Sequence, residues 1–172
     1  INTIMPPAQA REPEPVAAVD WDALVLEMAA GPIHEPTEPQ QPEPDLSYIP
    51  LDKPLVETLV ASCEEQGVPL ELALAVIERE SGFDVDAVGL DGHDVGLFQI
   101  RSSNHEWLTK ETGADPVTPE GNIVCGVWFL AYLYDYTGSW EAALTCWRWG
   151  PGNGETSKYA SAVLGAAEHW KT

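Results

Sequence analysis

The chain has 172 residues, which is room for one domain of ordinary size and an additional segment. Its 28 Asp and Glu residues outnumber 8 Lys and Arg, and the resulting net charge of -20 argues against nonspecific binding to nucleic acid or anionic lipid. The sequence holds no run of about 18 apolar residues, the length that a membrane-spanning helix requires. We therefore expect no nucleic-acid partner and no membrane span.

Residues 1–50 form an acidic, proline-rich segment. They hold ten of the 15 prolines and nine acidic residues, against Arg11 as their single Lys or Arg. Such a composition cannot bury enough apolar surface for a core, so it predicts a mostly disordered linker. Residues 16–30 are its one apolar stretch. They are expected to form either a short helix that docks a protein partner around Trp21 or a transient helix within the tether.

Residues 51–172 have the pattern of a compact helical domain, in which short apolar periods are separated by sharp breaks. The first two helices are expected at 54–66, before Gly67, and at 69–81. Between residues 87 and 100 the period shortens, and Asp91 with Gly92 offers the positive φ angles of a tight turn. This pattern predicts a small β-hairpin, followed by a loop or single helical turn at 101–108.

Three further helices complete the expected domain. One begins at Thr118 and Pro119 and ends near Tyr136, before Gly138. The next begins after Ser139 and ends at residues 150–151, and the last begins near residues 155–156. The predicted class is α+β and mainly α.

The cysteine and histidine patterns give no sign of a cofactor or a metal. Three cysteines without CxxC spacing argue against a zinc site or a disulfide framework, although Cys125 and Cys146 could form one bridge or remain buried thiols. The four histidines are scattered without the spacing of metal ligands. We expect neither metal nor cofactor.

Glu80 is the most informative residue of the chain. In a helix over 69–81 it falls near the middle of the apolar arc, while Glu71, Glu78 and Arg79 fall on the opposite side. A carboxylate on a buried face loses hydration, which raises its pKa and suits it to act as a general acid. The alternative is a helix end at Ser81 that leaves Glu80 in solvent.

Five short motifs follow one another along residues 80–159. Together they resemble the catalytic domain of lytic transglycosylases and goose-type lysozymes, in the lysozyme-like superfamily, over about residues 54–170. The motifs are Glu80 to Phe83 (ESGF), Gly96 to Ile100 (GLFQI), Asn122-Ile123 with Gly126, Ala143-Leu144 leading to Trp147 and Gly150, and Glu155-Thr156 with Tyr159. The resemblance implies a helical domain with a β-hairpin beside an active-site cleft, and cleavage of the β-1,4 bond between N-acetylmuramic acid and N-acetylglucosamine in peptidoglycan.

The resemblance also implies roles for individual residues. Glu80 would be the acid, and in the transglycosylases the same group then acts as base on the C6 hydroxyl of the sugar. Asp94 matches an aspartate in the ribbon of animal-type lysozymes, so it is either a second carboxylate, as retaining glycosidases need, or a turn residue. Each further candidate has both a site role and a local one, namely Ser81 (orienting the acid or capping), Gln99 (binding a sugar or the backbone), Tyr159 (near the acid or in the core) and Trp147 with Trp149 (stacking on sugars or packing).

Two arginines depart from the family pattern. Arg148 stands where the family has an asparagine that contacts sugar, and Arg101 stands where an animal-type ribbon has asparagine. Either they bind acidic groups of the peptide stem of the glycan, or they mark a different substrate preference.

The resemblance implies a monomer that acts outside the cytoplasm, as a secreted or envelope protein. Two other readings stay open: a hydrolytic lysozyme that uses Glu80 and Asp94, and a glycan-binding module without turnover in an envelope or phage assembly.

Overall fold

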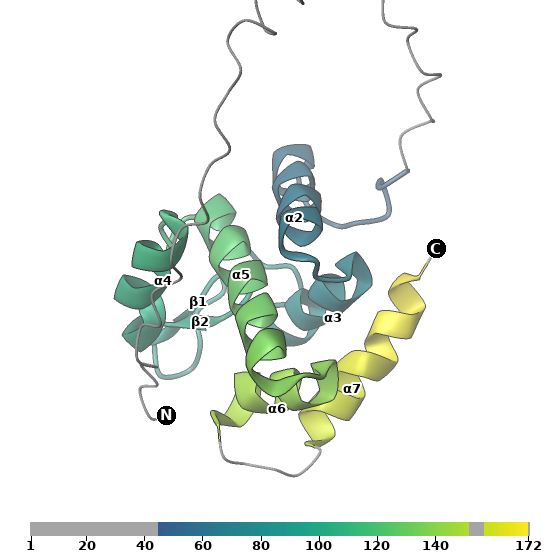
Figure 1. Cartoon of the computed structure of the whole chain (residues 1–172). Helices are drawn as coiled ribbons and strands as arrows, with labels where there is room; N and C mark the ends of the chain where they lie inside the picture. Colours follow the sequence, from purple (N-terminus) through teal and green to yellow (C-terminus); the bar gives the residue numbers. More distant parts are fainter. Residues whose placement is uncertain (1–44, 152–156, 172) are drawn as a thin grey trace, which may run out of the picture. The chain divides into compact units, whose positions relative to one another are not determined.

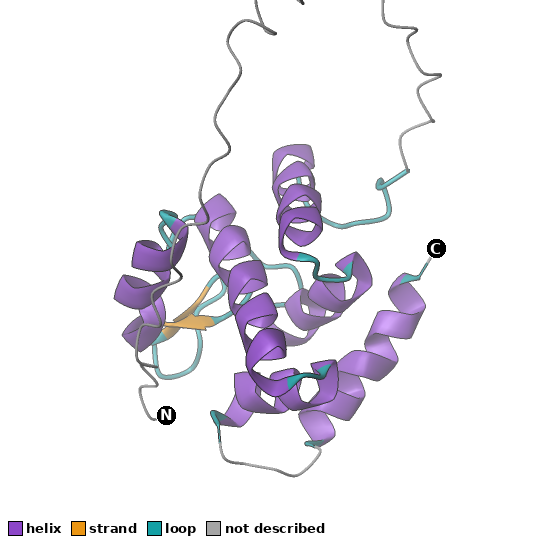
Figure 2. Cartoon of the chain, in the orientation of Figure 1, coloured by secondary structure: helices purple, strands orange, loops and turns teal. Residues whose placement is uncertain are grey.

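The computed structural model describes residues 45–151 and 157–171, and this part is mostly helical with one small antiparallel sheet (Figures 1 and 2). The elements, in chain order, are α2 (Lys53–Gln66), α3 (Leu70–Glu80), β1 (Asp94–Val95), β2 (Ile100–Arg101), the 3-10 helix η1 (Ser102–Asn104), α4 (His105–Thr112), α5 (Pro119–Thr137), α6 (Trp140–Trp149), α7 (Lys158–Ala167) and the 3-10 helix η2 (Glu168–Trp170). The predicted fold class is confirmed. The expected helix at 16–30 and the motif residues Glu155 and Thr156 lie outside the described residues.

Helix ends coincide with the breaks that the sequence contains. Gly67 and Gly138 follow α2 and α5 in the left-handed conformation, with φ of 68° and 80°. This conformation is easy for glycine because it has no Cβ. At the opposite ends, the Thr118 and Ser139 side chains accept hydrogen bonds from backbone N–H groups in the first turns of α5 and α6. The expected helices in these parts of the chain are therefore confirmed, to within a residue or two.

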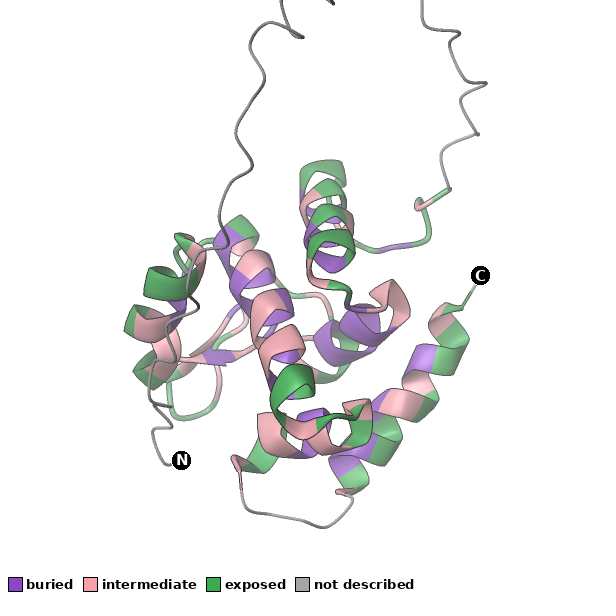
Figure 3. Cartoon of the chain, viewed as in Figure 1, coloured by how far each residue is buried: buried purple, intermediate pink, exposed green. Residues whose placement is uncertain are grey.

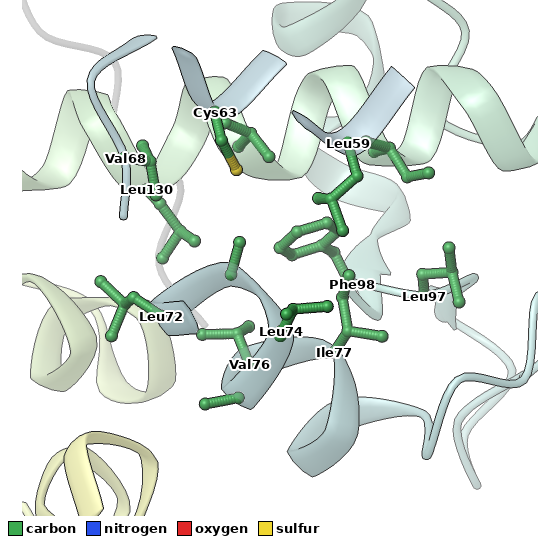
Figure 4. Close-up of a cluster of buried hydrophobic side chains, with 14 of the residues drawn as sticks. Leu59, Cys63, Val68, Leu72, Leu74, Val76, Ile77, Leu97, Phe98 and Leu130 are labelled. Atoms are coloured by element: carbon green, nitrogen blue, oxygen red, sulfur yellow. The ribbon is translucent and has the colours of Figure 1, made fainter. Parts of the chain in front are cut away.

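Helix α3 lies inside the core rather than at its edge. Its residues 72–77 are all buried, so the helix is covered on every side and not on one arc, as the sequence suggested (Figure 3). The helices α2 and α7 and the 3-10 helix η2 pack against it. In Figure 4 the side chains of Leu59, Ile77 and Phe98 gather in one cluster, which joins α2, α3 and the turn before β2. Glu80 is the last residue of α3 and is partly buried, just beyond this fully buried stretch.

The predicted hairpin is present, and the chain folds back twice within it. The register of β1 and β2 pairs Asp94 with Arg101 and Val95 with Ile100. The expected turn at Asp91 and Gly92 is present and precedes the turn that joins β1 to β2. Gly92 has a φ of 74° there, and Val88 bridges back to Val95. Two successive turns thus place residues 87–101 in a small compact ribbon.

Residues after the ribbon form more helix than the sequence suggested. Where a loop or one helical turn was expected at 101–108, the chain forms η1 and then the eight-residue α4. Only Trp107 and Leu108 of this stretch are large apolar residues, so its apolar period was too short to reveal a helix. Leu108 is fully buried and the Trp107 ring packs on Trp128 of α5 at a centroid distance of 5.4 Å, which holds α4 in place.

The packed region begins before residue 51. Ile49 is buried in the core and Leu46 packs against it, so residues 46–50 belong with the helices rather than with a linker.

Cys63, Cys125 and Cys146 are all free thiols, so the bridge considered for Cys125 and Cys146 is absent. Among the described helices, none combines the length and the apolar composition needed to cross a membrane.

Candidate active site

Two donors from the C-terminal half of the domain meet at the carboxyl group of Glu80, the last residue of α3. The Tyr159 hydroxyl, from the first turn of α7, donates a hydrogen bond to Oε1. The Trp147 indole, from α6, donates to the same oxygen at 3.3 Å. Oε2 receives no hydrogen bond from the described residues. Glu80 is partly buried and does not extend into solvent from a frayed helix end.

Packing fixes the positions of both donors. Tyr159 is buried, and the Trp147 ring lies 6.1 Å from the Phe98 ring and 5.2 Å from the Phe129 ring. Aromatic rings at these centroid distances attract one another and have little freedom to turn. The two side chains can therefore hold the carboxyl of Glu80 in one orientation.

A pair of hydroxyl groups joins α6 to the start of α7. The Thr145 hydroxyl donates to Ser157 Oγ at 3.2 Å and accepts from the Ser157 backbone N–H at 3.3 Å. Ser157 in turn accepts at its Oγ from the backbone N–H of Ala160, which caps α7. This link sets the start of α7 relative to α6, and so places Tyr159 beside Trp147.

The surroundings of Glu80 raise its pKa. Burial is the largest influence and acts upward, while the hydrogen bonds from Tyr159 and Trp147 and the positive charge of Arg148 act downward, and the charge of Asp94 adds a small rise. The net direction is upward, so the carboxyl holds its proton to a higher pH than an exposed glutamate does. Burial and the charge of Glu80 also raise the pKa of Tyr159, which keeps that hydroxyl protonated as a donor.

Asn122, in the first turns of α5, holds the ribbon against the helices. It is almost fully buried, and its amide nitrogen donates to the carbonyls of Val95 (3.0 Å) and Pro116 (2.8 Å), while its oxygen accepts from the backbone N–H of Phe98 at 2.8 Å. Gly96 lies directly on this amide: a Cβ there would stand 2.6 Å from it, and the φ of 72° also favours glycine. Gly96 and Asn122 belong to two separate sequence motifs, and the sequence alone did not show that they touch.

Phe98 lies between the Asn122 contacts and Glu80. A Cβ on Gly126 of α5 would lie 2.2 Å from Phe98 Cγ, so the ring rests directly on the α5 backbone. The Phe98 ring also meets Trp147, whose indole donates a hydrogen bond to Glu80. A chain of contacts thus runs from Gly126 of α5 through the Phe98 and Trp147 rings to the carboxyl of Glu80.

Asp94 is held by an arginine. Both of its carboxylate oxygens lie 3.2 Å from Arg101 Nη1, and Arg101 Nη2 contacts Asp91 Oδ2 at 2.8 Å. Asp94 is near enough for its charge to raise the pKa of Glu80. Arg101, which departs from the animal-type pattern, is thus occupied by two aspartates of the same ribbon.

Ser81 and Gln99 make local contacts. The Ser81 hydroxyl donates to the Ile77 carbonyl at 3.1 Å, which is a helix-end contact and not a contact to Glu80. The amide nitrogen of Gln99 donates to the carbonyls of Ala87 (3.0 Å) and Gly96 (2.9 Å). A sugar contact by Gln99 would therefore use its side-chain oxygen.

Arg148 and Trp149 form the exposed end of α6. The guanidinium carbon of Arg148 lies 5.3 Å from the centre of the Trp149 ring, a cation–π arrangement. Arg148 is close enough to Glu80 and to Tyr159 for its charge to lower the pKa of both. This positive charge stands beside the candidate acid in a strongly acidic protein.

Among the residues that the structure describes, no group of three His, Cys, Asp or Glu side chains could hold a metal ion.

Comparisons with known proteins identify the family and agree with the fold. The model of a family described as the transglycosylase SLT domain matches residues 59–167, a span that includes Glu80, Asn122, Trp147 and Tyr159. A solved structure with a similar fold is that of the lytic transglycosylase Slt from Pseudomonas aeruginosa, as an inactive mutant with glutamine in place of a glutamate. The TM-score is 0.59 and the identity 21%, and the match covers 69% of this chain but only 24% of the Pseudomonas chain. Since the family model matches more than half of the sequence, the chain belongs to the transglycosylase SLT domain family.

Proposed function

We propose that this protein is a lytic transglycosylase that cleaves the β-1,4 bond between N-acetylmuramic acid and N-acetylglucosamine, with Glu80 as acid and then base. The observation that carries the proposal is a partly buried carboxyl group with a raised pKa, held at one oxygen by Tyr159 and Trp147. Family membership supports it. So does the inactive glutamate-to-glutamine form of the Pseudomonas enzyme, which indicates that a carboxyl group matters in that protein.

The proposed reaction starts from protonated Glu80. Oε2 gives its proton to the glycosidic oxygen, the bond from that oxygen to C1 of the muramic acid breaks, and positive charge develops on the sugar ring. The resulting carboxylate is stabilised by the donors Tyr159 and Trp147 at Oε1. It then takes the proton of the C6 hydroxyl while that oxygen bonds to C1. A 1,6-anhydro end forms, Glu80 recovers its proton, and no water is consumed.

The state of Asp94 favours this route over hydrolysis with two carboxylates. A nucleophilic or charge-stabilising carboxylate needs an oxygen directed at the sugar, and both oxygens of Asp94 face Arg101. We propose that Asp94 and Arg101 together shape the ribbon, and that its charge only adjusts the pKa of Glu80. The single-carboxylate route then uses the one acid that the site leaves available.

Arg148, Trp149 and Gln99 are proposed to contact the substrate. Arg148 forms no ion pair with a described residue, lies beside Glu80 and is exposed, so it suits a carboxylate of the peptide stem. Trp149 offers an exposed ring for a sugar face, and Gln99 Oε1 can accept from a sugar hydroxyl. A protein with this substrate would act in the cell envelope, which agrees with the location expected from the sequence.

The test is the exchange Glu80→Gln, which keeps the shape of the side chain and replaces its ionisable carboxyl group with a neutral amide that cannot act as the acid. We expect the variant to fold and to release no glycan fragments from peptidoglycan, measured by mass spectrometry of the digest. Glu71→Gln is the matched control, because Glu71 lies on the same helix in its first turn. It should keep full activity.

The same digests distinguish a lytic transglycosylase from a hydrolytic lysozyme and from a binding module. Fragments with 1,6-anhydro ends support the transglycosylase, whereas fragments with reducing ends indicate a hydrolytic lysozyme. If Glu80→Gln releases fragments at the wild-type rate, the assignment of the acid is wrong. If the wild-type protein binds peptidoglycan and releases nothing, the chain is a binding module.

A further inference from the structure

Trp170, at the C-terminal end of the described chain, reaches back to the end of α3. Its indole Nε1 donates a hydrogen bond to Glu78 Oε2 at 2.9 Å. Its ring meets the Phe83 ring in an edge-on contact at 5.4 Å and the Tyr48 ring at 6.2 Å. Glu78 and Phe83 lie two residues before and three residues after Glu80. The Trp170 side chain therefore contacts the chain on both sides of the candidate acid.

The segment that Trp170 grips has an unfavourable backbone conformation. After Glu80 the chain turns through Gly82, with φ of 60°, and Phe83, with φ of 67°. Glycine adopts such angles freely, but for Phe83 they bring its Cβ close to the following carbonyl. A residue holds this conformation only when its surroundings impose it, and such residues gather at functional sites. The Phe83 ring packs against the core and meets Trp170 in an edge-on contact, so Trp170 is one of the neighbours that hold it.

The position of Glu80 makes this restraint important. A residue at the C-terminal end of a helix has no following turn to hold it, so its direction depends on the segment after it. The Glu80 carboxyl must stay within hydrogen-bond distance of Tyr159 and Trp147, which come from other helices. Figure 1 shows α7, which leads into η2, beside α3.

We infer that Trp170 is a positioning residue for Glu80: by holding Glu78 and Phe83, it fixes the end of α3 in the one direction that brings the acid to its donors. This inference rests on the proposed function of Glu80. It assigns a role in the reaction to the C-terminal 3-10 helix, which packs against α3 while the recorded hydrogen bonds to Glu80 come from α6 and α7. Loss of the Trp170 contacts with Glu78 and Phe83 should expose the end of α3 to water without removing any group that binds substrate.

The experiment compares Trp170→Phe with Trp140→Phe. Trp170→Phe keeps a ring against Phe83 and removes the N–H bonded to Glu78. We expect kcat to fall about tenfold, since small misplacements of a catalytic group are costly, with KM unchanged. We also expect the alkaline limb of the pH profile of kcat/KM to move to lower pH, because a hydrated Glu80 loses its proton more easily. Trp140, at the other end of α6, packs on Tyr134 at 4.3 Å, and Trp140→Phe should change neither quantity.

A double-mutant cycle tests whether the hydrogen bond is the means. Glu78→Ala removes the acceptor and should reproduce the loss of Trp170→Phe, and the double variant should lose no more than either single one. The inference is overturned if folded Trp170→Phe has the wild-type kcat and alkaline limb, or if Trp140→Phe shows the same losses. Should Trp170→Phe fail to fold, Glu78→Ala decides by the same two readouts. Failure of the proposed function would show separately, as turnover retained in Glu80→Gln.

Discussion

At the scale of single residues, Glu80 must satisfy two opposite requirements. As an acid it needs a raised pKa, and as the carboxylate formed after proton transfer it needs stabilisation. Burial supplies the first, whereas the hydrogen bonds from Tyr159 and Trp147 act in the opposite direction and supply the second. The balance allows one carboxyl group to give a proton and take one back, as the single-carboxylate route demands.

Replacement of Tyr159 by Phe tests this balance. The variant keeps the ring and removes the hydroxyl that donates to Glu80, so the pKa of Glu80 should rise further and the alkaline limb of the activity profile should move to higher pH. A hydrogen bond to a charged group is worth about 1.5–3 kcal/mol, so kcat should fall about tenfold or more. Tyr136→Phe, at an exposed tyrosine of α5, serves as control. An unchanged or acid-shifted limb in Tyr159→Phe would contradict the role given to the hydroxyl.

The raised pKa of Glu80 also predicts how stability depends on pH. A group whose folded pKa lies above its unfolded value, about 4.3 for glutamate, stabilises the fold fully below the unfolded value and loses that contribution as pH rises through the folded pKa. Glu80→Gln stays neutral throughout. Urea unfolding at several pH values should therefore show the variant gaining stability relative to wild type as pH increases. A difference independent of pH would show that Glu80 titrates normally.

At the scale of elements, the contact between α5 and the ribbon controls the site. Gly126→Ala would place a methyl group 2.2 Å from Phe98 Cγ, which forces the ring to move. Because overpacking typically costs about 1–3 kcal/mol, we expect a lower free energy of unfolding. Activity should fall too, since the ring supports Trp147. Gly165→Ala, in α7 with open space around its Cβ, should instead gain about 0.5–1 kcal/mol. Equal effects of the two substitutions in chemical denaturation would refute the close packing.

Elements with strong local signals could be predicted from the sequence, and elements held by distant contacts could not. Thr118, Ser139, Gly67 and Gly138 marked helix ends because capping depends on neighbouring residues alone. The helix α4 escaped notice because its stability comes from packing on α5. The positive φ of Phe83 left no sign in the sequence, since bulky residues rarely adopt it.

The candidate site divides in the same way. Periodicity singled out Glu80, and the family-like motifs singled out Trp147 and Tyr159, but only the fold shows that both donate to one carboxylate oxygen. These donors lie 67 and 79 residues from Glu80 along the chain, beyond the reach of any local pattern. The pairing of Asp94 with Arg101 was equally hidden, because it depends on the register of β1 and β2.

At the scale of the whole molecule, negative charge dominates. Twenty of the 28 acidic residues and seven of the eight Lys and Arg residues follow residue 44, so the helical domain is itself strongly acidic. The structure records four ion pairs between described residues, each between at least partly exposed side chains. Exposed pairs contribute little, typically below about 1 kcal/mol each. Repulsion among the remaining carboxylates should therefore outweigh these attractions.

This balance predicts that salt stabilises the protein. Raising sodium chloride from about 20 mM to about 500 mM shortens the Debye length from roughly 20 Å to a few ångströms, which screens repulsion between carboxylates across the surface. The melting temperature at neutral pH should rise accordingly. Near pH 4 many carboxylates are protonated, so the same increase in salt should have a smaller effect there. A melting temperature that falls with salt at neutral pH would mean that the ion pairs around Arg101 outweigh the repulsion, and that the acidic surface carries little self-repulsion.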